Sequence, residues 1–420
     1  MRLIYLLSLV FALNVSAGEI IHAGRLLDVE NTIVLTEQTI YTDGERIVRV
    51  EDGYTGGDKA IDLTNHLVMP GWIDMHVHIA TQLSPNSYEE KFRLNPEDYA
   101  IRSVRHAKLT LMAGFTTVRD LGTAYDVAQS LRNNIRLGVV PGPRIFTAGT
   151  TIATTGGHGD ASNGVGRELD RDLGPADGIV NSASDAYKAV RARYKDGSDL
   201  IKITATGGVL SQAKSGMNAQ FTVEEIQAIV AAAKDNGFKV AAHAHGTEGM
   251  RRAVVGGVNS IEHGTFMTPE VMKLMKKKGT WYVPTILAGM FVAEKAKTPG
   301  YFSELVRPKA IAIGPQIKDT FAAAYKAGVK IAFGTDTGVS AHGDNWQEFL
   351  HMVDAGMPPM EAFIAATKSA AELLDQSDDM GSITEGKYAD IIAIEGDPLT
   401  DISLVENVSF VMKGGTVHKQ

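Results

Sequence analysis

The sequence lacks cysteine, long apolar runs and clusters of basic residues. Without cysteine there is no disulfide, no all-thiolate zinc site, no iron–sulfur cluster and no thiol nucleophile. The 41 basic residues are outnumbered by 49 acidic ones and form no block, which argues against nucleic acid as a partner. No stretch reaches the roughly 20 apolar residues of a membrane span. The chain of 420 residues, 44% hydrophobic, suffices for one large domain, alone or with a smaller one.

The chain opens with a short positive start and a brief apolar run. Arg2 precedes the apolar residues 3–13, and residues 14–17 read Asn-Val-Ser-Ala, a small-x-small cleavage pattern. This pattern predicts a secretory signal over residues 1–17 and therefore a secreted or periplasmic protein. The alternatives are a retained anchor and a buried first strand.

The remainder divides into two kinds of segment. Short β-like pieces occupy residues 18–65 and 378–420, which predicts a small β-sandwich domain built from both termini. Residues 66–377 alternate short apolar strands with amphipathic helices, the pattern of a parallel sheet with crossover helices. Eight βα units predict an α/β fold, a (β/α)8 TIM barrel, with a doubly wound open sheet as the rival. The eight strands are expected at residues 71–76, 115–119, 144–148, 200–204, 239–243, 260–263, 281–285 and 330–334.

Side chains that can bind metal gather at the ends of these strands. His76 and His78 are two residues apart at the end of the first strand, so both face the same side. Asp336 follows the eighth strand. A closed barrel brings its strand ends together, which predicts a metal site there. Six of the 12 histidines lie at or just after strand ends: His76, His78, His158, His243, His245 and His263.

A lysine lies inside the fourth strand. Lys202 is flanked by Ile201 and Ile203, and buried lysine is rare unless it is paired. Apolar neighbours favour the neutral amine, which is the form that reacts with CO2. The sequence therefore indicates a special role for this side chain.

In this order, these residues resemble the metal-dependent amidohydrolase superfamily, and the likeness spans nearly the whole chain after residue 17. The resemblance implies a binuclear centre in which Lys202, carboxylated by CO2, bridges two divalent metal ions. The matching segments are residues 70–78 (Pro-Gly-Trp-Ile-Asp-Met-His-Val-His), Lys202, His243, residues 261–263, residues 334–336 and the tail at 381–390. The resemblance implies that one ion is held by His76, His78 and Asp336, and the other by His243 and His263.

A carbamate changes what a lysine can do at such a centre. The free side chain, with a pKa near 10.4, is a cation that repels metal, whereas the carbamate is a bidentate anion. Zinc is the expected ion for nitrogen and oxygen ligands, with manganese and cobalt as alternatives. A hydroxide shared by two ions would attack an amide, and Asp336 would carry its proton to the leaving amine.

Within the superfamily the chain is most similar to the imidazolonepropionase-related branch, which includes Xaa-Pro dipeptidases, carboxypeptidases of N-acyl amino acids and ochratoxin-type amidohydrolases. Residues 154–160 and 204–208 carry this likeness. The resemblance implies that His158 contacts the substrate carbonyl or carboxylate and that His245 donates to the oxyanion. His245 stands where the dipeptidase members carry a tyrosine, which favours the ochratoxin-type hydrolases.

Such substrates carry a free carboxylate, which needs a cation or another donor. Arg119 and Lys214 are the candidates, and His342 is a further pocket candidate. For Arg119 the alternative is a structural ion pair with Asp120. For His342 the alternative is a place on the surface, and for His158 a role in ordering its loop.

Three other functions stay open at this point. A cyclic-amide hydrolase of the same superfamily would use the same ligands. A mononuclear deaminase is disfavoured by Lys202, because one metal ion has no use for a bridge. A non-catalytic binding barrel is the alternative outside enzymes, although such a barrel would be expected to lose part of the ligand set. The expected partner is a small molecule or dipeptide, and related enzymes are often homo-oligomers.

Overall fold

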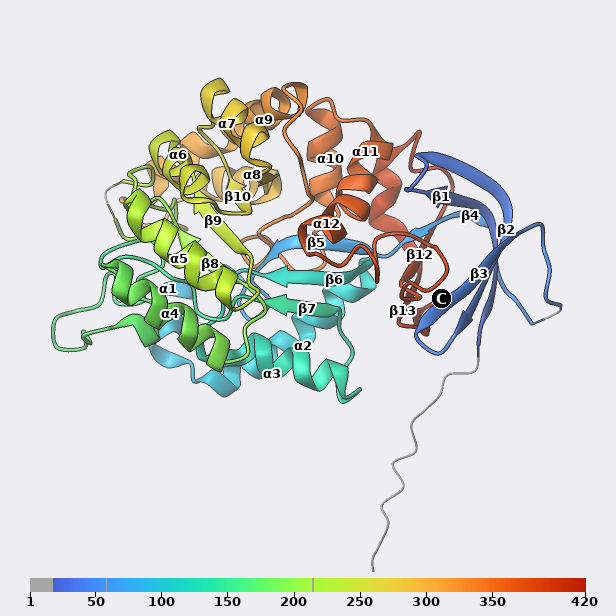
Figure 1. The fold of residues 1–420 in the computed structure, drawn as a ribbon, viewed down its shortest axis with the longest axis horizontal. Coiled ribbons are helices and arrows are strands. Elements are labelled where there is room, and N and C mark those ends of the chain that lie inside the picture. The colour runs from blue at the N-terminus through green and yellow to red at the C-terminus, as the bar shows by residue number, and fades with distance from the viewer. Residues whose placement is uncertain (1–17, 58, 214) are drawn as a thin grey trace, which may run out of the picture.

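A ring of short parallel strands, surrounded by helices, forms the interior of the larger domain (Figure 1). The computed structural model describes residues 18–57, 59–213 and 215–420, so the predicted signal peptide and Lys214 lie outside the described residues. The ring confirms the predicted (β/α)8 barrel. Its strands are almost wholly buried because helices cover their outer face and side chains fill their inner face. The strands are β5 (Trp72–Val77), β6 (Phe115–Asp120), β7 (Arg144–Thr147), β8 (Ile201–Thr204), β9 (Val240–Ala244), β10 (Ser260–His263) and β11 (Trp281–Val283).

Regular ladders hold the ring in two arcs, and single contacts join the arcs. One arc has the order β5-β6-β7 and the other has the order β11-β10-β9-β8. At the first junction Ile152, which follows β7, forms an isolated parallel bridge with Ile203 of β8. At the second junction, residues 330–337 are bridged to β11 through Ile331 and to β5 through Thr337. The eighth predicted strand is therefore present as an extended segment without a regular ladder.

Helix α11 (Pro359–Ala365) explains why the eighth segment lacks a ladder. The backbone N–H groups of Ile73 and Phe333 donate to the carbonyl oxygens of Ala366 and Ala365, at 2.7 and 3.0 Å. The last carbonyls of a helix have no partner inside the helix, so they readily accept such donors. The end of α11 thus accepts hydrogen bonds from backbone N–H groups of the first strand and of the eighth segment, which are then not available for a ladder between the two.

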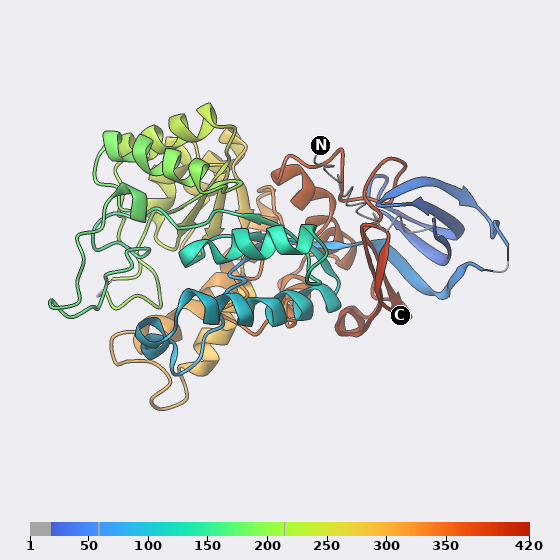
Figure 2. The ribbon, with the colours of Figure 1, turned by 90° about the horizontal axis from the view of Figure 1, so that it is seen from below.

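The helices lie outside the ring and over its carboxyl-terminal end (Figures 1 and 2). Helix α5 (Val223–Asp235) begins with a capping box: the Thr222 side chain accepts from the Glu225 backbone while the Glu225 side chain accepts from the Thr222 backbone. None of the helices in the described ranges is long and apolar enough to cross a membrane. The α-helices are α1 (Ser87–Arg93), α2 (Pro96–Met112), α3 (Val127–Arg136), α4 (Ala183–Lys195), α5 (Val223–Asp235), α6 (Thr247–Gly256), α7 (Pro269–Lys278), α8 (Ile286–Lys295), α9 (Arg307–Lys326), α10 (Gln347–Asp354), α11 and α12 (Lys368–Leu373), with short 3-10 turns at Ala124–Asp126, Pro175–Asp177 and Ile402–Asn407.

The two ends of the chain form a second domain beside the barrel (Figure 1). Its strands form one seven-stranded sheet of order β14-β13-β12-β4-β1-β2-β3, which confirms the β domain predicted from both termini. Strand β12 pairs directly with β4, with Ile392 opposite Met69, and so joins both termini in one ladder. The strands are β1 (Ile20–Asp28), β2 (Ile33–Asp43), β3 (Arg46–Asp52), β4 (Ile61–Pro70), β12 (Ile391–Glu395), β13 (Val408–Lys413) and β14 (Thr416–Lys419).

Candidate active site

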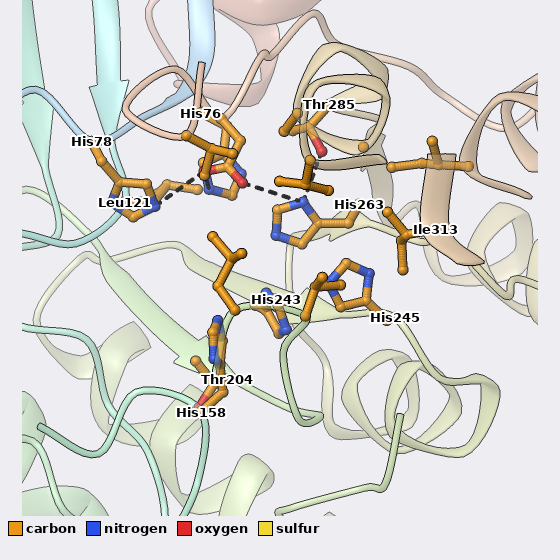
Figure 3. Close-up of a pocket in the computed structure, with 18 of the residues that line it drawn as sticks. His76, His78, Leu121, His158, Thr204, His243, His245, His263, Thr285 and Ile313 are labelled. Atoms are coloured by element: carbon orange, nitrogen blue, oxygen red, sulfur yellow. Dashed lines mark hydrogen bonds and ion pairs between the residues drawn. The ribbon is translucent and has the colours of Figure 1, made fainter. Parts of the chain in front are cut away.

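A cavity of about 250 Å³ lies at the carboxyl ends of the barrel strands (Figure 3). His158 and His245, which the sequence predicts to act on the substrate, line it. An open sheet would spread these strand ends along an edge, whereas the closed ring collects them around one space. All predicted metal ligands line the same cavity: His76, His78, Lys202, His243, His263 and Asp336.

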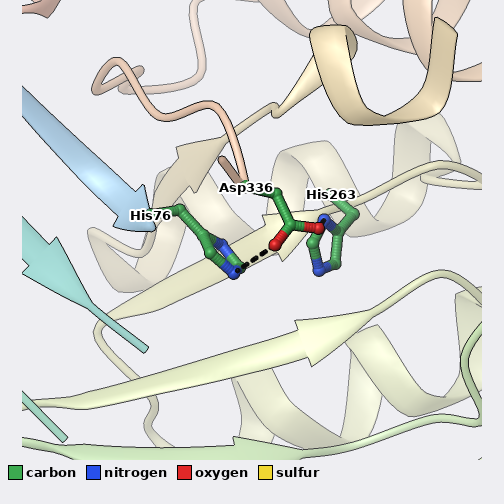
Figure 4. Close-up of side chains that lie close together, drawn as sticks. All are labelled: His76, His263 and Asp336. Carbon is green, nitrogen blue, oxygen red and sulfur yellow. Dashed lines mark ion pairs between the residues drawn. The ribbon is translucent and has the colours of Figure 1, made fainter. Parts of the chain in front are cut away.

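The carboxylate of Asp336 lies at the centre of this group. Its Oδ1 is 3.4 Å from His76 Nε2 and 3.2 Å from His78 Nε2, and its Oδ2 is 4.0 Å from His263 Nδ1. The ligand atoms of His76, His263 and Asp336 all lie within 4.8 Å of one another (Figure 4). Oδ1 is buried, yet no described donor makes a well-aligned hydrogen bond to it. A buried anionic oxygen without a donor is costly, so this oxygen fits a cation.

One nitrogen of each ligand imidazole is held by the protein. His76 Nδ1 donates to the carboxylate of Glu262 at 3.0 Å, and His78 Nδ1 donates to a backbone carbonyl at 2.9 Å. Such an acceptor fixes the proton on Nδ1 and leaves the Nε2 lone pair for a metal. His243 has the opposite arrangement, because its Nε2 donates to a backbone carbonyl at 3.0 Å and leaves Nδ1 free. Burial lowers the pKa of His76 and His243 well below the usual value, which favours the neutral, ligating form.

Three successive strand ends turn through the left-handed backbone region. The φ angles are +69° at His263, +53° at Thr285 and +58° at Asp336. Each such residue costs about 1–3 kcal/mol and is typical of functional sites. Strict alternation along β10 would place Glu262 inside the barrel and His263 outside, whereas the turn brings both inside. Thr285 Oγ1 then lies 2.7 Å from His263 Nδ1 and orients that ring.

Lys202 is 3% exposed, and its Nζ lies 3.5 Å from His76 Nε2. Burial lowers the pKa of this ammonium group to about 8, against the attraction of the nearby Glu262 and Asp336 carboxylates. At pH 7 roughly a tenth of such a group is the neutral amine. The position therefore fits the bridge predicted from the sequence.

The two histidines predicted to act on the substrate are also held at one nitrogen. His158 Nδ1 is hydrogen-bonded to the hydroxyl of Ser211, and its ring centre is 4.4 Å from that of His243. His245 Nδ1 is 2.8 Å from Thr265 Oγ1. Burial lowers the pKa of both His158 and His245 to about 3, so both rings are neutral.

Arg119 does not line the cavity, which corrects its expected role in binding a substrate carboxylate. It is 2% exposed, and its Nη2 donates to Glu262 Oε1 at 2.9 Å rather than to Asp120. Because the other Glu262 oxygen accepts from His76 Nδ1, Arg119 supports the predicted metal ligand His76 through Glu262. Sequence reasoning misses Glu262, whose signal is limited to a carboxylate inside the sixth strand, directly before the predicted ligand His263.

We expect Arg119→Met to lower the free energy of unfolding by about 3–5 kcal/mol, because it leaves the buried Glu262 carboxylate without its cation. Urea unfolding of the metal-loaded protein measures this. Arg136→Met, at an exposed position in the last turn of α3, should change it by less than about 0.5 kcal/mol. An unchanged free energy of unfolding combined with a raised KM would instead support the original prediction that Arg119 binds the substrate carboxylate.

Of the remaining two substrate-binding candidates, His342 is not part of the cavity lining. His342 is 4% exposed, its Nε2 is 2.8 Å from the Thr81 carbonyl oxygen, and its ring stacks on His106 at 4.2 Å. It is therefore a core residue rather than a surface or pocket residue. Lys214 lies outside the described residues, and its prediction stays a prediction.

Opposite the histidines the cavity wall is apolar. It consists of one face of α8 and the facing residues of α9, together with Val209 and Leu210 after β8. At Gly289 of α8 the two helices lie so close that a Cβ atom would come within 2.7 Å of the Ile317 side chain of α9, so a larger residue does not fit there. The cavity therefore offers polar ligands on one side and room for an apolar group on the other. The apolar wall residues on the two helices are Ala288, Gly289, Val292, Ile313 and Ile317.

The sequence model of the amidohydrolase family matches residues 67–418. The chain belongs to the amidohydrolase family. This confirms the superfamily predicted from the strand-end motifs, and the chain is accordingly a hydrolase that acts on C–N bonds.

Individual relatives place this amidohydrolase more narrowly. The ochratoxinase of Aspergillus niger is 33% identical over 372 residues, which are 84% of this chain and 76% of the relative. The structure of a Xaa-Pro dipeptidase with bound methionine in the active site is 51% identical, with a TM-score of 0.94, over 96% of this chain and 100% of that chain. The structure of a prolidase complexed with N-methylphosphonate-L-proline is 31% identical, with a TM-score of 0.88, over 96% of this chain and 100% of that one.

Proposed function

We propose that this amidohydrolase uses two divalent metal ions, with zinc as the expected metal, to hydrolyse the C-terminal amide of a dipeptide or N-acyl amino acid. When bound, such ions supply a Lewis acid for the carbonyl and lower the pKa of water toward neutrality. The observation that carries the proposal is the convergence of the six predicted ligands on one cavity. In this proposal His76, His78 and Asp336 would hold one ion and His243 and His263 the other, and Lys202, carboxylated by CO2, would supply the ligand shared between them.

Three side chains would handle the substrate. Asp336, whose Oδ1 fits a cation, would take the proton of the attacking water at Oδ2 and pass it to the leaving amine. His245 and His158 can accept a hydrogen bond at Nδ1 from the Thr265 and Ser211 hydroxyls. In that tautomer each Nε2–H is free to donate, His245 to the carbonyl oxygen and His158 to the substrate carboxylate.

Xaa-Pro dipeptides are the leading substrate class. The support is the 51% identity to a Xaa-Pro dipeptidase over nearly the full length of both chains. The apolar wall of α8 and α9 suits the side chain of the Xaa residue. An N-acyl amino acid of the ochratoxin type is the second candidate, supported by the 33% identity to ochratoxinase and by His245 in place of the tyrosine of the dipeptidase members.

The first experiment is elemental mass spectrometry on the purified protein, combined with hydrolysis of Ala-Pro and Met-Pro and of an N-acyl phenylalanine. We expect about two metal ions per chain and release of free proline, both abolished by a chelator and restored by zinc with bicarbonate. One ion per chain with turnover of a purine or pyrimidine would indicate the mononuclear deaminase. No metal after reconstitution and no amide hydrolysis would contradict the proposal and leave a binding barrel.

A further inference from the structure

The metal cavity is one of three adjoining cavities. Its volume of about 250 Å³ lies below the about 300–1,000 Å³ typical of pockets for drug-sized ligands. A second cavity of about 450 Å³ lies beyond His78 and Val339, which line both spaces. A third cavity of about 710 Å³ lies beyond His158, which lines the first and third. The small central space is therefore flanked by larger ones on two sides.

Leu210 stands where the three cavities meet. Among the described residues it is the one that lines all three. Its side chain packs against the apolar cluster that includes Val292 of α8 and Ile313 of α9. The leucine therefore forms a partition between the metal centre and the two outer spaces, anchored on the apolar wall.

The backbone around Leu210 is fixed on both sides. Gly208 lies directly against the His158 ring, since a Cβ at this glycine would come within 2.2 Å of that ring. On the other side the Ser211 hydroxyl is hydrogen-bonded to His158 Nδ1. The segment that carries Leu210 is thus tied to a residue predicted to contact the substrate.

Lys309, at the start of α9, fastens this segment to the helix. Its Nζ donates to the carbonyl oxygens of Gly208, Ser211 and Ala213, at 3.3, 2.8 and 2.8 Å. Lys309 forms no ion pair within the described part of the chain, so its ammonium group is satisfied by hydrogen bonds to these carbonyl oxygens. Three charge-assisted hydrogen bonds from one ammonium group therefore tie the segment to α9.

We propose that Leu210 limits the length of the substrate and that Lys309 is the positioning residue that holds this partition in place. The inference rests on the proposed function. A dipeptide fits the small central space, and a residue added at either end would have to pass Leu210 into an outer cavity. Truncation of Leu210 would join the central space to both neighbours.

The test compares the metal-loaded protein on Ala-Pro, Ala-Ala-Pro and Ala-Pro-Ala. We expect the unchanged protein to cleave both tripeptides with a kcat/KM at least tenfold below that for Ala-Pro. Leu210→Ala should raise the ratio of at least one tripeptide to Ala-Pro tenfold or more. Leu137→Ala, at a leucine 77% exposed at the end of α3, should leave both ratios unchanged.

Two results would overturn the role of Leu210: tripeptides cleaved as well as Ala-Pro by the unchanged protein, or unaltered ratios in a Leu210→Ala protein that still cleaves Ala-Pro. If Leu210→Ala does not fold, Leu210→Val carries the same test with a shift of the same sign. Metal-loaded, unchanged protein that cleaves none of the three peptides would contradict the proposed function, and this inference with it.

Lys309 is tested by the same ratios. Lys309→Met should shift them in the direction of Leu210→Ala, because the freed segment lets Leu210 move aside, and Lys309→Arg should restore at least half of the discrimination. A lower kcat on all three peptides with unchanged ratios would mean that Lys309 only supports the fold, and would overturn its positioning role.

Discussion

Lys202→Ala is expected to lose most of the bound metal and to lower kcat/KM about a thousandfold, since several kcal/mol of Lewis-acid stabilisation corresponds to that factor. The side chain is almost fully buried, and its Nζ lies 3.5 Å from Nε2 of His76, the nitrogen that is left free for a metal ion. Its removal leaves a gap between the two groups of histidines, where a small carboxylate can take the place of a carbamate. Acetate or propionate should therefore restore part of both metal content and turnover. Elemental mass spectrometry and Ala-Pro hydrolysis on the same samples measure the two effects.

The matched control for this variant is Lys234→Ala, at an exposed lysine in the last turn of α5. It should keep two ions per chain and full turnover. A Lys202→Ala protein with unaltered metal content and activity would rule out the bridging role. Loss of metal without any rescue by carboxylic acids would show that a small carboxylate cannot replace the carbamate. The bridging role of Lys202 would then be supported only by the loss of metal.

Asp336→Asn is expected to lower kcat about a thousandfold, within the about 10²–10⁴ that a positioned acid–base group contributes. Asparagine suits this test because it has nearly the same shape and tolerates the left-handed backbone angle that Asp336 adopts. Its amide oxygen can still bind metal, but the amide cannot take a proton from water. At saturating zinc the variant should therefore retain metal while its turnover is lost, which elemental mass spectrometry and Ala-Pro hydrolysis on the same samples measure.

Asp235→Asn, at the exposed end of α5, is the matched control and should leave kcat unchanged. If the kcat of Asp336→Asn at full metal occupancy is within threefold of that of the unchanged protein, Asp336 does not carry the proton. Loss of metal that zinc cannot restore would make Asp336 essential as a ligand and would assign the lost turnover to the missing ion.

Local patterns in the sequence suffice for much of the barrel and for the candidate ligands. Apolar runs separated by amphipathic helices mark strands and crossovers, and histidine pairs two residues apart, such as His76 and His78, mark strand ends that face the interior. These signals involve residues close together in the sequence, so they can be recognised without any knowledge of the fold.

What the sequence could not provide depends on partners distant in the chain. The partner of Arg119 is Glu262 on another strand rather than the adjacent Asp120, and no local pattern distinguishes the two. The eighth strand has no regular ladder because backbone N–H groups at this junction donate to carbonyls at the end of α11, a helix that follows the strand in the chain. His263 faces the cavity because its backbone turns through the left-handed region, a conformation too uncommon outside glycine for a local pattern to predict it.

The single sheet built from both ends of the chain has a consequence for synthesis. Strand β4 is made early, whereas its neighbour β12 belongs to the last 30 residues. While the chain emerges from the ribosome, β1 to β4 can pair among themselves, but one edge of β4 stays open until nearly all of the barrel has been made. Closing this sheet is therefore a late event, and a chain cut short before β12 would expose an apolar strand edge of the kind that promotes aggregation.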